Sequence, residues 1–70
     1  MVEKTIDLTG TSANSIEDAV ALAVSRAAVT ISGLRRARTV DTHAVIENGK
    51  VTAWKVDLRV TFEIKDSLHE

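Results

Sequence analysis

The sequence predicts a small α+β domain of order β-α-β-β, with one helix packed on an antiparallel sheet. Three observations predict it: hydrophobic residues alternate near both ends of the chain, a helical period lies between them, and a tight-turn dipeptide separates the last two strands. The chain has 70 residues, with no cysteine and no proline. A single domain spanning residues 1–70 is expected, and disulfides and thiolate metal sites are excluded.

The predicted strands follow from alternation and from turn residues. Residues 2–8 alternate between apolar and polar side chains, and residues 10–12 are expected to end that strand. Asn48-Gly49 is a strong hairpin signal, because both turn positions require a positive φ. It separates a strand over residues 34–46 from a regularly alternating strand over residues 51–64.

The predicted helix lies between the first two strands. Ser15 is a candidate N-cap, and Glu17 and Asp18 follow it, where the helix dipole favours negative charge. Gly33 is a natural stop after the helix. The pattern indicates an amphipathic helix of about 17 residues. Its apolar positions recur every three or four residues: Ile16, Val20, Ala23, Ala27 and Ile31.

The predicted hairpin register gathers positive charge on one face. Without a bulge, the Asn48-Gly49 turn places Arg38 directly opposite Arg59, with Arg36 on the diagonal. Like charges at opposed positions destabilise a sheet, and Asp57 offsets only part of this. Arg36, Arg38 and Arg59 are therefore an anion or interface patch, unless they form a solvated basic face with splayed side chains. The same register turns His43 toward the helix, on the face of Trp54, as a packed or interface residue.

The predicted helix is too short for the predicted hairpin. Hairpin strands of this length extend roughly 40–45 Å, whereas the helix covers about 26 Å. A chain of this size also buries only about 60% of the surface that its unfolded form exposes. We therefore expect other copies of the chain to cover the overhang in a homo-oligomer.

Composition narrows the function classes. Charged residues make up 27% and hydrophobic residues 44%, which is typical of a globular protein, and the net charge is -1. This balance argues against a nucleic-acid partner, although the Arg35, Arg36, Arg38 and Arg59 patch keeps that alternative open as the weakest one. No apolar run is long enough to span a membrane, and no signal peptide is recognisable. The expected location is cytoplasmic.

Several motifs together resemble the dodecin family. The chain has Leu8-Thr9-Gly10-Thr11-Ser12 where the family has its T-G-T-S turn, and a helix with the family's spaced alanines over residues 19–27. Residues 54–64 match the family's closing strand. The resemblance covers nearly the whole chain. It implies a helix on a curved three-stranded antiparallel sheet, assembled into a hollow homododecamer.

The resemblance also locates a ligand pocket, and there the chain departs from the family pattern. Flavin-binding dodecins stack the flavin on a Trp, and that position is Arg36 here, while Lys55 replaces a Gln that hydrogen-bonds the flavin edge. By resemblance, the pocket positions are Arg36, Arg38, Val45 and Lys55. Binding of FMN or riboflavin is therefore predicted to be weak or lost. The Arg35-Arg36-Ala37-Arg38 stretch resembles a subgroup without the Trp, for which calcium binding has been suggested.

These observations predict a non-enzymatic dodecin-like protein that binds or stores a small ligand as a homododecamer. The alternative is a structural or cation-binding shell that holds calcium or magnesium without an organic ligand. Carboxylates repeated by symmetry can converge on a hard cation, and Glu17, Asp18 and Asp41 are the candidates for a metal. No nucleophile and base are recognisable as a catalytic set.

Overall fold

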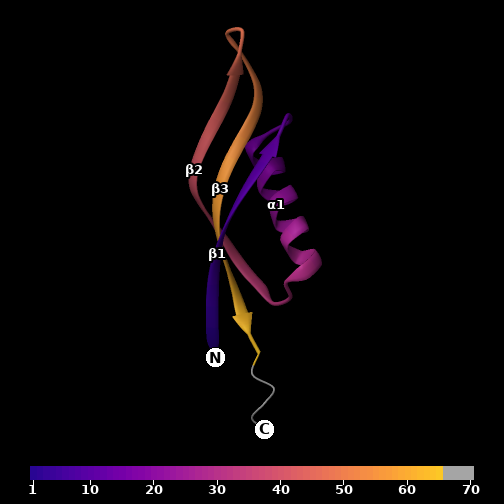
Figure 1. The fold of residues 1–70 in the computed structure, drawn as a ribbon, viewed down its shortest axis with the longest axis vertical. Coiled ribbons are helices and arrows are strands. Elements are labelled where there is room, and N and C mark those ends of the chain that lie inside the picture. The colour runs from indigo at the N-terminus through magenta and orange to yellow at the C-terminus, as the bar shows by residue number, and fades with distance from the viewer. Residues whose placement is uncertain (66–70) are drawn as a thin grey trace.

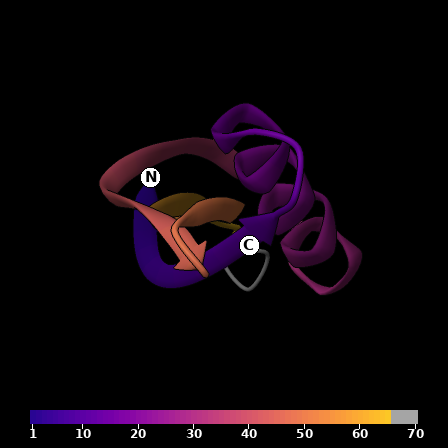
Figure 2. The same cartoon turned by 90° about the horizontal axis from the view of Figure 1, so that it is seen from above.

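The computed structural model describes residues 1–65, in four elements (Figure 1). These are β1 (Val2–Ser12), α1 (Ile16–Thr30), β2 (Leu34–Glu47) and β3 (Lys50–Ile64). The strands form one antiparallel sheet in the order β1-β3-β2, so β3 lies in the centre. Figure 2 shows that this sheet is curled and that α1 lies along one side of it. The predicted β-α-β-β fold is confirmed.

The core lies between β3 and α1. Val56, Leu58 and Val60 of β3 are almost completely buried, and so is Ala19 of α1. These alternate residues of β3 all point toward the helix, as the sequence pattern predicted, and Trp54 belongs to the same side of the strand. Partly buried apolar residues surround them: Ile6, Leu8, Val20, Ala23, Val24 and Leu34.

Strand β1 is longer than predicted. It continues through Gly10 to Ser12, which pairs with Trp54 of β3, so Gly10 does not end the strand. A Cβ atom at Gly10 would overlap the backbone carbonyl oxygen of Ala19. The glycine therefore serves the close approach of α1 to the sheet, a tertiary requirement that looks like a strand break in the sequence.

The helix has the predicted cap but ends earlier than predicted. The Ser15 hydroxyl accepts a hydrogen bond from the Asp18 N–H at 3.0 Å, which confirms the N-cap. Ile31 is the C-cap in an extended conformation, so α1 has 15 residues. Gly33 follows with a φ of 79°, and its carbonyl accepts a hydrogen bond from the Glu63 N–H at 2.9 Å. Within the described part of the chain, no helix is long and apolar enough to cross a membrane.

Two bulges change the predicted register in the middle of the hairpin. Thr52 of β3 and Val40 of β2 are extra residues, so the pairing between them is displaced by one position. Asp41 therefore lies opposite Asp57, and His43 lies opposite Lys55. The prediction that His43 faces the helix beside Trp54 is wrong, because a one-residue displacement turns a strand's side chains to the other face.

The far end of the hairpin extends beyond α1, as expected from the element lengths (Figure 1). The molecule is 59 Å long, whereas a 15-residue helix covers about 22 Å. Val40, Ile46 and Val51 of the hairpin are 52%, 63% and 50% exposed in the single chain. Residues 66–70, which include His69 and most of the predicted polar tail, lie outside the residues that the structure describes.

The contact between Gly10 and Ala19 predicts a sharp effect of one methyl group. Gly10→Ala should lower the free energy of unfolding by about 1–3 kcal/mol, because α1 must move away from β1. Chemical denaturation followed by circular dichroism measures this. Thr11→Ala, at the exposed neighbouring position, is the control and should change stability by less than about 0.5 kcal/mol. Equal stabilities for the Gly10 variant and the wild type would contradict the close contact.

Candidate functional site

The sheet face that points away from α1 carries most of the candidate functional side chains. We call it the outer face. The pairing of the strands defines its members: Glu3, Thr5, Asp7, Thr9 and Thr11 on β1; Arg36, Arg38, Asp41, His43 and Val45 on β2; and Ala53, Lys55, Asp57, Arg59, Thr61 and Glu63 on β3.

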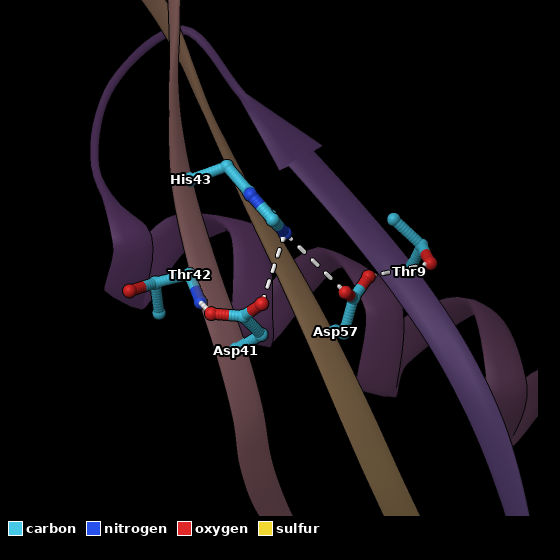
Figure 3. A network of polar contacts seen from close by, with 5 residues as sticks. All are labelled: Thr9, Asp41, Thr42, His43 and Asp57. Atoms are coloured by element: carbon cyan, nitrogen blue, oxygen red, sulfur yellow. Dashed lines mark hydrogen bonds and ion pairs between the residues drawn. The ribbon is translucent and has the colours of Figure 1, made fainter.

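Three side chains of the outer face converge near the middle of the hairpin (Figure 3). His43 Nε2 lies 3.4 Å from Asp57 Oδ2 and 3.6 Å from Asp41 Oδ2. One potential ligand atom from each residue lies within 4.8 Å of the other two. We call Asp41, His43 and Asp57 the carboxylate–histidine cluster.

Hydrogen bonds hold both carboxylates of this cluster. The Thr9 hydroxyl donates to Asp57 Oδ1 at 3.0 Å, and the Thr42 N–H donates to Asp41 Oδ1 at 3.0 Å. In each carboxylate the other oxygen, Oδ2, is the one near His43 (Figure 3). The cluster therefore presents one nitrogen and two oxygen atoms to a common point, an arrangement able to bind a cation.

The three metal candidates from the sequence lie in two different places. Asp41 belongs to the carboxylate–histidine cluster, whereas Glu17 and Asp18 lie in the first turn of α1. Asp18 Oδ2 accepts hydrogen bonds from the Ser12 hydroxyl at 2.6 Å and from Asn14 Nδ2 at 3.4 Å, so it takes part in the helix cap. Within residues 1–65, the carboxylate–histidine cluster is the one place where at least three histidine or acidic side chains lie close enough together to share a metal ion.

The basic patch of the outer face is partly neutralised within the chain. Arg38 lies directly opposite Arg59, as predicted. Arg59 Nε lies 3.1 Å from Asp7 Oδ1, and an Arg36 nitrogen lies 3.4 Å from Glu3 Oε1. Strand β1 thus supplies two carboxylates that the hairpin register alone did not reveal. Arg38 has no carboxylate partner within residues 1–65.

A further ion pair joins the ends of two strands. Arg35, at the start of β2, donates a hydrogen bond to Glu63 near the end of β3. That hydrogen bond, together with the positive charge of Arg35, holds the pKa of Glu63 below its usual value. The same pair raises the pKa of Arg35.

The structure places the pocket positions inferred by resemblance at two separate points of the outer face. Arg36 lies opposite Thr61, whereas His43, two residues from Val45, lies opposite Lys55. The bulges are what bring Val45 to this face. Thr61 and Lys55 are six positions apart on β3, which corresponds to about 20 Å. Arg36 and Lys55 therefore do not meet within one chain, and a pocket that uses both must include a second copy.

The sequence did not indicate the partners of Asp41. The unbulged register places His43 on the opposite face and Asp57 beside the arginines as a counter-charge. Two aspartates and a histidine on neighbouring strands predict a metal site only when it is known that all three side chains lie on the same face of the sheet. Two bulges decide those faces, and neither has a glycine or another recognisable sequence mark.

Comparison with known proteins agrees with the fold and the motifs. The dodecin family model matches residues 2–65. The chain belongs to the dodecin family.

Among the relatives of this dodecin is calcium dodecin from Mycobacterium tuberculosis, 37% identical over 65 residues, which cover 91% of this chain and 90% of that protein. A crystal structure of a calcium dodecin from the same organism, described as calcium chelating with a novel calcium-binding site, matches with a TM-score of 0.81 and 34% identity over 100% of both chains. The dodecin from Streptomyces coelicolor matches with a TM-score of 0.89 and 30% identity over 94% of each chain.

Proposed function

We propose that this protein is a non-enzymatic, homododecameric binding or storage protein of the dodecin family in the cytoplasm, with weak or no binding of FMN or riboflavin. The observation that carries the proposal is Arg36, which stands where flavin-binding dodecins have their stacking Trp. Lys55 likewise replaces the Gln expected at the flavin edge. The expected partners are other copies of the chain and a small molecule or ion, with no nucleic acid and no membrane.

The local geometry supports the loss of flavin stacking. The Arg36 guanidinium lies near Glu3 of β1, so part of its charge is already engaged. Loss of an aromatic stacking contact costs about 1–3 kcal/mol in related systems. Trp54 does not replace it, because Trp54 pairs with Ser12 and Ala44 on the helix side of the sheet. Arg38, without a carboxylate partner in residues 1–65, keeps the Arg36, Arg38 and Arg59 patch available to an anion or to a neighbouring chain.

Flavin titration tests this proposal. The wild type should leave the fluorescence of riboflavin and FMN nearly unchanged at micromolar protein. Arg36→Trp combined with Lys55→Gln restores both recognition groups and should produce strong quenching. Arg38→Trp combined with Lys55→Gln is the matched control and should not. Strong quenching by the wild type would contradict the proposal.

The exposed apolar end of the hairpin supports the oligomeric part of the proposal. Light scattering on the purified protein should give a mass of about twelve chains of 7.6 kDa each. The physical reason is that one 15-residue helix leaves Val40, Ile46 and Val51 in water unless other copies cover them. A monomer at micromolar concentration would contradict both the assembly and any ligand pocket shared between chains.

A second candidate function is a calcium- or magnesium-binding shell without an organic ligand. The observation that favours it is the pair Asp41 and Asp57, which lie directly opposite each other on β2 and β3. Opposed like charges destabilise a sheet unless a cation neutralises them. Ca²⁺ takes six to eight oxygen ligands, so water or neighbouring copies would complete its coordination. The similarity to calcium dodecins supports calcium as the ion.

Calorimetric titration with Ca²⁺ tests the place of such a site. Asp57→Asn should weaken Ca²⁺ binding by about tenfold or more, because one of two anionic ligands is lost. Glu17→Gln removes a carboxylate at the start of α1 and should leave binding unchanged. The reverse result, with binding lost in the Glu17 variant and kept in the Asp57 variant, would place the ion at α1 instead.

A further inference from the structure

We propose that the carboxylate–histidine cluster binds a transition-metal ion of the zinc type, with His43 Nε2 as a direct ligand beside Asp41 and Asp57. The inference goes beyond the proposed calcium or magnesium binding, because it assigns a different ion class to the same pair of aspartates and adds His43 as a ligand. Three independent features carry it: the spacing of the ligand atoms, the orientation of the carboxylates and the nitrogen donor.

The contacts from His43 to the two carboxylates are long hydrogen-bond or ion-pair contacts, and their lengths also fit ligands around a shared ion. The distances from His43 Nε2 to the two carboxylate oxygens are 3.4 and 3.6 Å, whereas well-formed N–H···O bonds measure about 2.7–3.2 Å. Tetrahedral ligands about 2.0–2.1 Å from a zinc ion lie roughly 3.3–3.4 Å from each other. The imidazole and the carboxylates are thus already separated by about the distance that a shared ion requires.

The carboxylates are oriented as metal ligands usually are. Outer hydrogen bonds commonly fix the direction of ligand groups. Here the Thr9 hydroxyl and the Thr42 N–H each hold one oxygen of a carboxylate, on the side away from the proposed ion. Figure 3 shows the three side chains coming from two strands, with Thr9 contributed by the third.

The charge of the cluster also favours a divalent ion. Asp41 and Asp57 place two acidic side chains at directly opposed positions of the sheet. Positive groups are close by: Lys55 lies opposite His43, and Arg59 is two residues from Asp57. Arg59 is engaged by Asp7, at 3.1 Å, and is therefore not the counter-ion of Asp57. The side chains of Asp41, His43 and Asp57 are 63%, 46% and 42% exposed, so solvent or a neighbouring copy has access to a fourth coordination position.

The nitrogen ligand determines the ion class. Calcium and magnesium prefer oxygen ligands, whereas imidazole suits zinc, copper, iron and nickel. Calcium binding would use only the two carboxylates, so a change of His43 would leave it unaffected. The inference and the proposed calcium site therefore make different predictions for His43.

Titration of the assembled full-length protein with Co²⁺ and Zn²⁺ tests the inference. Co²⁺ should bind with visible absorption bands of a low-coordinate site, and Zn²⁺ should abolish them by displacement. His43→Gln should weaken Zn²⁺ binding by about tenfold or more and remove the bands. His69→Gln, which changes the chain's other histidine, is the matched control and should behave as the wild type. Light scattering on each variant verifies that assembly is unchanged.

The outcomes separate this inference from the proposed function. If Ca²⁺ binds through Asp57 and His43→Gln has no effect on Zn²⁺, the inference is overturned and the calcium shell stands. If Zn²⁺ binding depends on His43 while Ca²⁺ does not bind, the inference stands and the calcium shell fails. Equal loss of Zn²⁺ binding in the His43 and His69 variants would also overturn the inference, because the loss would then not be specific to the carboxylate–histidine cluster.

Discussion

The central position of β3 is the constraint on which the rest of the structure depends. It is hydrogen-bonded to β1 on one edge and to β2 on the other. One of its faces packs against α1, and the other carries the polar side chains of the outer face. Val56, Leu58 and Val60 point toward α1 and form the core with Ala19. The residues between them point away, and they bring β1 and β2 groups together across a single strand. Any change in the register of β3 would therefore alter both the core and the outer face.

The close packing of α1 covers only part of the sheet (Figure 1). Gly10 lets the helix approach β1 and β3, and the Ser15 cap starts the helix close to the end of β1. The hairpin continues well beyond the helix, and its apolar residues there are exposed in the single chain. A small domain that leaves such a surface in water is marginal by itself, so association offsets what the short helix cannot cover.

The outer face of this dodecin carries charges of both signs in separate places. Carboxylates of β1 pair with Arg36 and Arg59, which allows arginines to occupy neighbouring positions on β2 and β3. Farther along the same face the charge reverses, and Asp41 and Asp57 surround His43. The face thus has a cationic part and an anionic part, and the second offers ligand atoms suited to a metal ion.

The sequence by itself determined the element order, the helix-facing side of β3 and the N-cap, because alternation, capping and turn chemistry are local. The predicted opposition of Arg38 and Arg59 holds because the two bulges between that pair and the turn offset each other. The sequence did not determine the end of β1, because Gly10 is required by the close approach of Ala19 in α1 and not by a turn in its own segment. The partners of Asp41 and His43, and the carboxylates that neutralise Arg36 and Arg59, were decided only by the tertiary structure. Bulges at Val40 and Thr52 leave no mark in the alternation of either strand, yet each turns the following side chains to the opposite face.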